Sequence, residues 1–435
     1  IREIADRHVG ETSTTIGLAI TNQRETFVVF ERQSGRPLHH AIVWQCRRGD
    51  AICQKLASAG ADQIVRRKTG LKLDTYFSGS KLRWLLDEKP ELRRQLESGE
   101  ALVGTIDTYL IYRLTNCEVF ATDSTNASRT LLYDIGRLKW DEELGDLFGV
   151  PIRVLAEVRE SFDTFGITDA AGLLPRKLAI CGVMGDSQAS LFGQCCYEKG
   201  TAKATYGSGT SVMLNAGDRF EASERGGVSA LAWVRHGSPV YALEGLINYS
   251  SATIAWLKNQ LGLVSDAAET ESLARAVEDN AGVYFVPAFA GLSAPYWSRN
   301  ARAAILGMTA YTRREHVVRA ALEAIAYQIR DVLEMLRTES RVAPALLCAD
   351  GGPTRNDFLM QFTADMIGVE LIVAKVAETS ARGAAMAAMF GLGVVDSLSE
   401  LAKIRGDVRV YRPQMDVEKV EQLYTGWQQA VQRVL

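Results

Sequence analysis

The chain has 435 residues, of which 47% are hydrophobic and 23% charged, so it is long enough for two or three globular units with cores of their own. Its 49 basic and 52 acidic residues are mixed along the chain and leave a formal net charge of −3, which argues against nucleic acid or an anionic membrane as the main partner. No apolar stretch is long enough to cross a bilayer, and the start of the sequence has no signal-peptide layout.

The first half of the chain alternates short apolar runs with amphipathic stretches, which predicts alternating strands and helices. The first two strands are expected to pair as a hairpin across the polar turn at 21–26. The expected strands are 16–20, 27–30, 41–44 and 101–104, and the expected helices are 50–58, 80–87 and 105–115.

The most informative segment of the first half is the apolar run at 178–184, which is followed by Gly185 and Asp186. A buried strand that stops at a glycine places the next carboxylate at the mouth of the strand, where open α/β sheets present catalytic groups. The alternative is a structural aspartate that caps a helix.

A glycine turn follows about twenty residues later, between two apolar-leaning stretches. Its residues Gly207, Ser208 and Gly209 offer backbone N–H groups and a hydroxyl, which are the groups that bind an anion. An ordinary hairpin turn is the alternative. Taken together, the carboxylate and the turn predict a base that deprotonates a hydroxyl while a phosphate is held nearby.

The second half, which begins near Gly193, opens with hairpin-like stretches and a helix from about residue 250. Its clearest helix is 316–336, where apolar residues recur at steps of three and four. Small residues dominate 381–393, which predicts a helix packed tightly on a sheet.

A second candidate ligand site lies further along this half. The strand predicted at 345–349 ends in Asp350-Gly351-Gly352, and a helix opens near Asn356. A strand, a double glycine and a helix start form a suitable nucleotide site, because the helix N-terminus offers free N–H groups.

Cysteine and histidine usage excludes two further classes of protein. The seven cysteines are an odd number in a large chain and predict reduced thiols in a cytoplasmic protein, not a disulfide framework. The five histidines form no H-E-x-x-H motif and no zinc set, so no metal ligand is assigned.

Several segments of the chain carry family signatures. Residues 76–88, and residues 303–308 together with 316–323, resemble the FGGY family of carbohydrate kinases. Residues 21–26 and 43–48 resemble its glycerol kinase branch. The similarity runs through nearly the whole chain, with the segments in the family's order.

The resemblance implies an α/β fold with two actin-like (ribonuclease H-like) ATPase domains that flank an active-site cleft. Residues 1–193 would form the polyol-binding FGGY N-terminal domain, and residues 194–435 the nucleotide-binding C-terminal domain. The implied activity is ATP-dependent phosphorylation of glycerol to glycerol 3-phosphate, with ATP and Mg²⁺ as cofactors and a homo-oligomer, a dimer or tetramer, as the assembly.

The same resemblance assigns roles on the polyol side. Arg24 and Glu25 match the pair that binds the polyol, because a guanidinium and a carboxylate offer donors and acceptors to vicinal hydroxyls. Trp44 and Tyr76 match the walls of that pocket, although a lone aromatic residue is usually part of a core. Asp186 matches the general base and a substrate contact.

On the nucleotide side, the resemblance assigns phosphate and adenine contacts. The matching positions are Gly207, Ser208, Gly209, Ser251, Gly352 and Asn356.

Three departures from the family pattern carry expectations of their own. The sequence starts at Ile1, beyond the family's N-terminal phosphate-binding hairpin, so the chain as written is expected to lack half of the phosphate grip and to have little activity. Ser187 and Ser211 replace a glutamine and a phenylalanine of the polyol pocket, which predicts a roomier pocket and weaker glycerol binding. Residues 168–177 replace the loop that binds fructose 1,6-bisphosphate in regulated relatives, so no inhibition by that effector is expected.

Three alternative functions remain open from the sequence. The first is a kinase of the same family that acts on another short polyol, a triose or a small sugar. The second is a non-catalytic nucleotide-binding relative. The third is a hydrolase, since Gly185-Asp186-Ser187 looks like the nucleophile block of GDS-type esterases, but that family needs a late histidine and none follows His316.

Overall fold

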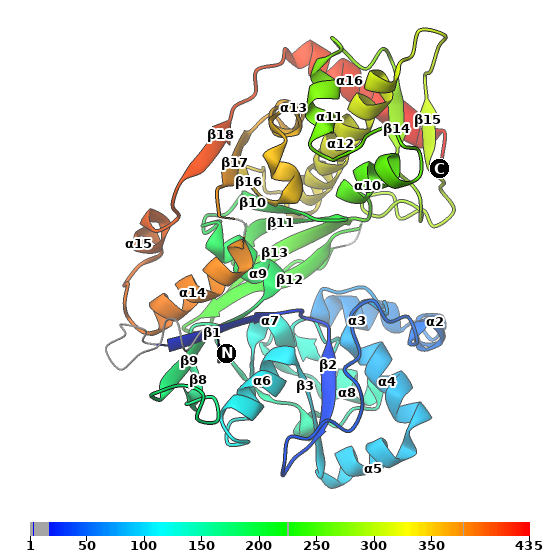
Figure 1. The fold of residues 1–435 in the computed structure, drawn as a ribbon. Helices are drawn as coiled ribbons and strands as arrows, with labels where there is room; N and C mark the ends of the chain where they lie inside the picture. Colours follow the sequence, from blue (N-terminus) through cyan, green and yellow to red (C-terminus); the bar gives the residue numbers. More distant parts are fainter. Residues whose placement is uncertain (1–2, 4–16, 224–225, 377) are drawn as a thin grey trace.

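The computed structural model describes residues 3, 17–223, 226–376 and 378–435. Small sheets and their helices make up the first half, and one large sheet with helices over it makes up the second (Figure 1). Within the described residues, no helix is long and apolar enough to span a membrane. All seven cysteines lie in this part and are free thiols, as predicted.

The first half is built on a small sheet in the order β1-β9-β8. Strands β1 (Gly17–Asn22) and β9 (Leu178–Gly185) are parallel, and β8 (Thr164–Thr168) is antiparallel to β9. The other strands of this half are β2 (Phe27–Glu31), β3 (Ala101–Thr105), β4 (Ala121–Asp123), β5 (Tyr133–Asp134), β6 (Lys139–Trp140) and β7 (Glu157–Arg159). Its helices are α2 (Asp50–Ser58), α3 (Ala61–Thr69), α4 (Ser78–Glu88), α5 (Pro90–Ser98), α6 (Ile106–Leu114), α7 (Ser124–Ala127), α8 (Glu142–Phe148), η1 (Ile152–Val154) and α9 (Asp186–Gly193).

The predicted hairpin between the first two strands is wrong. β1 pairs with β9, whereas β2 pairs antiparallel with β3, and Ile16 lies outside the described residues. The turn between β1 and β2 does not fold back on itself because its residues Arg24 and Glu25 are buried and pair with distant charged groups.

The strand predicted at 41–44 is also wrong. Ile42 makes only an isolated bridge to Phe27, and the chain then turns, with the N–H of Cys46 donating to the carbonyl of Val43 at 3.1 Å. Val43 is exposed, so the apolar run does not continue into a core.

The second half is built on a seven-stranded sheet in the order β12-β13-β11-β10-β16-β17-β18. Its strands are β10 (Thr201–Tyr206), β11 (Thr210–Gly217), β12 (Val228–Arg235), β13 (Ser238–Ile247), β16 (Leu346–Gly351), β17 (Glu370–Ala374) and β18 (Val408–Tyr411). The predicted hairpins are present, because β10 and β11, and likewise β12 and β13, are antiparallel neighbours. The remaining elements are α10 (Ser251–Asn259), α11 (Glu269–Arg275), β14 (Tyr284–Val286), β15 (Ala304–Leu306), α12 (Arg314–Ser340), η2 (Gly352–Arg355), α13 (Asp357–Ile367), α14 (Thr379–Gly391), α15 (Leu398–Lys403) and α16 (Val417–Gln432).

Helix α12 organises the core of the second half. The apolar residues that predicted it are all buried, and they pack in one cluster with residues of β10, β11 and β16. Burying such a stripe against a sheet supplies most of the stability of a long helix.

Helix α14 belongs to the second half but packs against α9 and β9 of the first (Figure 1). Small residues make this contact possible, as the composition of 381–393 predicted. A Cβ atom at Gly383 would lie 1.7 Å from the carbonyl oxygen of Ala189, so any larger residue would push the two helices apart. The predicted Asp186 therefore lies where the two halves meet.

A buried carboxylic acid of the first half, Asp107, gives the fold a pH dependence. Asp107 in α6 accepts a hydrogen bond from Thr122 Oγ1 at 2.6 Å. Burial, together with the neighbouring Asp123, raises the pKa of Asp107 to about 6 from 3.8. The folded chain therefore holds a proton that the unfolded chain has lost between these two pH values, and stability falls as the pH rises through this window.

We expect Asp107→Asn to stabilise the protein above pH 7, because the amide carries no charge. The gain is at most roughly 3 kcal/mol and disappears below about pH 4, where the wild-type carboxyl is neutral in both states. Urea unfolding of both proteins at pH 4.5 and pH 8 measures this difference. A constant difference across that range would contradict the assignment.

Candidate active site

Asp186 is the first residue of α9 and follows directly from β9. Gly185 is the N-cap of this helix, and the Asp186 carboxylate accepts from the amide of the next residue, Ser187, at 2.7 Å in the first turn. The side chain is 45% exposed, and its Oδ1 lies 3.2 Å from Nε of Arg24. A half-exposed carboxylate beside a buried cation at the junction of the two halves is available to a ligand.

Arg24 and Glu25 lie in the turn after β1, and both are 2% exposed. Arg24 Nη1 donates to Gln188 Oε1 at 3.2 Å, and its Nη2 donates to Glu244 Oε1 at 3.1 Å. Burial disfavours the charge of Arg24, but the carboxylates around it outweigh burial and hold its pKa above the ordinary value. The pair predicted to bind the polyol, called the floor below, is thus held in place by protein groups.

Two charged residues of this floor were not predicted from the sequence. Glu244 on β13 accepts from Arg24 and, through Oε2, from Arg129 Nη2 at 2.9 Å. Arg129 Nε also donates to Glu25 Oε1 at 2.8 Å. Burial would raise the pKa of Glu244, but Arg24, Arg129 and Lys203 hold it well below its usual range, so the carboxylate is ionised. The sequence offered one indication of Glu244, because it is the single acidic residue in the apolar run at 240–246.

Trp44 and Tyr76 lie next to each other, with ring centroids 5.5 Å apart. The buried Lys81 of α4 ties their segments together, because its Nζ donates to the carbonyl of Tyr76 at 2.9 Å and lies 3.5 Å from that of Trp44. Burial, and after it the charge of Glu25, raises the pKa of Tyr76 above its ordinary value, while the charge of Arg24 lowers it. The two neighbouring aromatic rings suit the predicted wall of the polyol pocket.

Ser187 and Ser211 have different surroundings. The amide of Ser187 donates to Asp186 Oδ1 at 2.7 Å. Ser211, on β11, donates through its hydroxyl to Glu244 Oε1 at 3.0 Å and receives a hydrogen bond from Lys203 Nζ at 3.2 Å. The roomier pocket stays a prediction, and Ser211 makes a polar contact with Glu244 that a phenylalanine could not make.

The glycine turn joins β10 to β11 and rests on the start of α10. The amides of Ser250 and Ala252 donate to the carbonyl of Ser208 at 2.8 and 3.1 Å, and Ser251 Oγ donates to the carbonyl of Gly207 at 2.6 Å. Gly207 and Ser208 are exposed. The start of α10 thus fixes the carbonyls of the turn, while Gly207 and Ser208 stay accessible to a phosphate.

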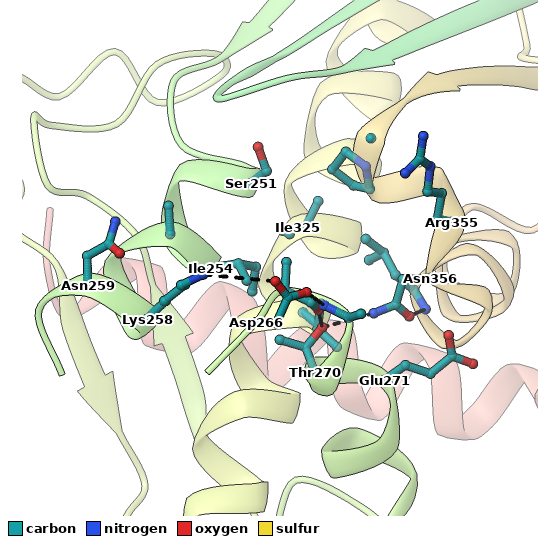
Figure 2. A pocket seen from close by; sticks show the side chains of 17 residues that line it. Ser251, Ile254, Lys258, Asn259, Asp266, Thr270, Glu271, Ile325, Arg355 and Asn356 are labelled. Carbon is teal, nitrogen blue, oxygen red and sulfur yellow. Dashed lines mark hydrogen bonds and ion pairs between the residues drawn. The ribbon is translucent and has the colours of Figure 1, made fainter. Parts of the chain in front are cut away.

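The predicted adenine-side residues line a cavity of about 620 Å³ between α10, α11, α12 and η2. Figure 2 shows Ser251 on one side of it and Arg355 and Asn356 on the other. Its apolar surface comes from Ile254, Leu322, Ile325 and Leu359, and polar groups surround it. Such a cavity accommodates a planar base with a few polar anchors.

The double glycine shapes one edge of this cavity. Gly351 has φ of +100°, and a Cβ there would lie 2.0 Å from the carbonyl oxygen of Tyr206, so only glycine fits. A Cβ at Gly352 would meet nothing within 4 Å, so this position faces open space. Asn356 caps α13 by accepting from the amide of Leu359 at 2.9 Å, and its Nδ2 donates to Thr270 Oγ1 at 3.2 Å (Figure 2). Thr270 is a lining residue that the sequence did not reveal.

Metal ligation by protein side chains alone has no support within the described ranges, where no three His, Cys, Asp or Glu residues come together. One buried carboxylate oxygen is nevertheless unsatisfied. Asp350, at the end of β16, accepts from Ser190 and Thr379 through Oδ2, while its Oδ1 has no hydrogen-bond partner.

Residues 1–193 match the N-terminal domain of the FGGY family of carbohydrate kinases, and residues 202–392 match its C-terminal domain. Among characterised relatives, "Glycerol kinase 1" of Thermotoga maritima is 47% identical over 96% of this chain and 85% of its own length. The glycerol kinase of Shewanella frigidimarina is also 47% identical, over 96% of this chain and 83% of its own.

Solved structures show the same similarity. The crystal structure of Plasmodium falciparum glycerol kinase with ADP superposes with a TM-score of 0.93 at 36% identity and covers 98% of this chain and 85% of its own. The gluconate kinase of Lactobacillus acidophilus shares the fold, with a TM-score of 0.86 at 21% identity over 98% of this chain and 85% of its own. The predicted two-part α/β kinase fold is confirmed.

Proposed function

Because the chain belongs to the FGGY family of carbohydrate kinases, we propose that it transfers the γ-phosphoryl group of ATP to glycerol and forms glycerol 3-phosphate. Its relatives named glycerol kinases support this substrate. The structural observation that carries the proposal is the half-exposed Asp186 carboxylate, paired with the buried Arg24 where the two halves meet.

Each half of the chain binds mainly one of the two substrates. Residues 1–193 supply most of the polyol floor and wall, and residues 194–435 supply the nucleotide cavity. The floor is shared, however, since Glu244 and Ser211 come from the second half. Polyol binding therefore depends on both halves.

In the proposed reaction, Asp186 accepts the proton of the glycerol hydroxyl as that oxygen attacks the γ-phosphorus of ATP, and ADP leaves. Arg24 holds the carboxylate from one side, and Trp44 and Tyr76 confine the carbon chain. Phosphoryl transfer needs little covalent help from the protein, so correct placement of the hydroxyl and neutralisation of charge supply most of the rate.

Mg²⁺ fits these residues as a partner of the nucleotide phosphates. The ion takes one or two protein carboxylates and keeps phosphate and water ligands. The half-exposed carboxylate of Asp186 and the unsatisfied Oδ1 of Asp350 are the groups that would hold it. When bound, it would neutralise charge on the phosphates. A dimer or tetramer and a cytoplasmic location stay predictions from the sequence.

A second candidate substrate is another short polyol or triose. The small side chains of Ser187 and Ser211, at positions that glycerol kinases typically fill with glutamine and phenylalanine, favour it. Comparing kcat/KM for glycerol, dihydroxyacetone, erythritol and xylulose with ATP decides between them. The proposal requires the highest kcat/KM for glycerol; a higher value for another polyol would replace it.

We expect Asn356→Ala to raise the KM for ATP about three- to tenfold with little change in kcat. The alanine removes both the cap of α13 and the bond to Thr270, so the edge of the cavity loses its anchor. Ser397→Ala is the matched control, because it removes the cap of α15 away from the cavity. Equal KM values for ATP in the wild type and Asn356→Ala would show that this edge does not bind the nucleotide.

A further inference from the structure

Ser211 lies between a buried cation and a buried anion. Its hydroxyl is 3.2 Å from Lys203 Nζ and 3.0 Å from Glu244 Oε1. Lys203, on β10, and Glu244, on β13, are each 1% exposed, and both strands flank β11. Met213 of β11 lies directly opposite both Lys203 and Glu244, so Ser211, two residues before it on the same strand, reaches the two charged side chains diagonally.

The chemistry of the three groups fixes the direction of the hydrogen bonds. A lysine ammonium can only donate, so Ser211 must accept from Lys203. Its single hydroxyl proton is then directed to Glu244, which is ionised because Arg24 and Arg129 hold its pKa low. A serine next to a carboxylate alone could rotate, whereas this one has a single orientation.

Glu244 links Ser211 to the arginines of the polyol floor. The same oxygen that accepts from Ser211 also accepts from Arg24 Nη2 at 3.1 Å, and the other oxygen accepts from Arg129. Arg24 is in turn the residue that lies against Asp186. A shift of the Glu244 carboxylate would therefore move the guanidinium that faces the base.

In the described part of the chain, Lys203 is buried, and the charges of Asp350 and Glu244 act on it. It forms no ion pair there, and its ammonium donates to two hydroxyls, those of Ser211 and of Thr205 at 3.1 Å. Burial, the largest influence, lowers the pKa of Lys203. A buried ammonium is costly unless its donors are satisfied, and here the hydroxyls of Ser211 and Thr205 accept from it.

We propose that Lys203, Ser211 and Glu244 form a hydrogen-bonded chain of positioning residues that sets the orientation of Arg24 and thereby the affinity for the polyol. The inference rests on the proposed function, because Arg24 is assigned there to the polyol floor. In this role the Ser211 hydroxyl fixes the position of Glu244 through a hydrogen bond, at a position where glycerol kinases typically have a phenylalanine.

The test compares Ser211→Ala, Ser211→Thr and Lys203→Met with the wild type. Steady-state kinetics with ATP give KM for glycerol and kcat, and thermal unfolding gives Tm. We expect Ser211→Ala to raise KM for glycerol about tenfold with kcat within about twofold, because a hydrogen bond to a charged group is lost. Threonine keeps the hydroxyl and should recover most of the affinity. Lys203→Met should resemble Ser211→Ala in its KM.

Ser229→Ala is the matched control. Ser229 is buried on β12, the strand next to the one that carries Glu244. Its hydroxyl donates to the carbonyl of Glu221 at 2.8 Å and not to the floor. This variant is expected to lower Tm without changing KM for glycerol. A purely structural role of Ser211 would give the same result in Ser211→Ala.

Each outcome decides a separate point. If Ser211→Ala keeps the wild-type KM, or if threonine fails to rescue it, the chain is not a positioning device. If Lys203→Met lowers kcat and leaves KM unchanged, the lysine acts on the transferred group and its place in the chain is wrong. If the wild type phosphorylates no polyol of the substrate panel, the proposed function itself fails, together with the inference.

Discussion

Asp186→Asn should lower kcat for glycerol phosphorylation by about 10²- to 10⁴-fold, because an amide cannot accept the proton of the attacking hydroxyl. Asparagine keeps the shape of the side chain and can still accept the amide hydrogen bond of Ser187. Binding of ATP and the unfolding midpoint should therefore stay close to the wild type. Stopped-assay kinetics with ATP and glycerol measure kcat, and calorimetric titration measures nucleotide binding.

Asp163→Asn is the control for this experiment, since Asp163 is an exposed residue of the same half that serves only a local turn. It should leave kcat unchanged. An Asp186→Asn protein that retains more than about half of the wild-type kcat would exclude Asp186 as the base, because loss of a general base costs several kcal/mol in the barrier.

Glu244→Leu should lower the free energy of unfolding by about 3 to 5 kcal/mol, the cost of breaking a buried ion pair by removing one partner. The two buried guanidinium groups of Arg24 and Arg129 would then share the carboxylate of Glu25 alone. Urea denaturation measures this loss. Where the variant stays folded, kcat/KM for glycerol should fall by more than tenfold, since the floor has lost its shape.

Glu244→Gln separates charge from shape, because the amide keeps one acceptor oxygen. It should lie between the wild type and Glu244→Leu in unfolding free energy. Glu334→Gln is the control, as Glu334 forms an exposed ion pair with Arg337 that contributes about 1 kcal/mol or less. An unfolding free energy of Glu244→Leu within 1 kcal/mol of the wild type would contradict the structural role of the buried cluster.

The sequence predicted the elements that depend on local patterns. Helix α12 was identified by its apolar spacing, and the position of Asp186 by the strand that ends at Gly185. The close packing of α14 followed from its small residues, since a helix without large side chains on one face can approach a neighbouring backbone closely, as Gly383 approaches Ala189.

The errors and omissions concern long-range pairing. Local sequence does not show whether two consecutive strands pair with each other or with strands elsewhere. Here β1 pairs with β9, which lies far along the chain, and not with β2. Glu244, Arg129 and Lys203 were missed for the same reason. Each is an ordinary charged residue in the sequence and becomes part of the site only when separate elements bring their charges together.

We expect this protein to transfer a phosphoryl group from ATP to glycerol, with Asp186 as the base. The most direct measurement is ³¹P NMR of a reaction that contains the protein, ATP, Mg²⁺ and glycerol. We predict a signal of glycerol 3-phosphate that grows in step with ADP, and no such signal with Asp186→Asn. Formation of ADP and inorganic phosphate without glycerol 3-phosphate would contradict the claim.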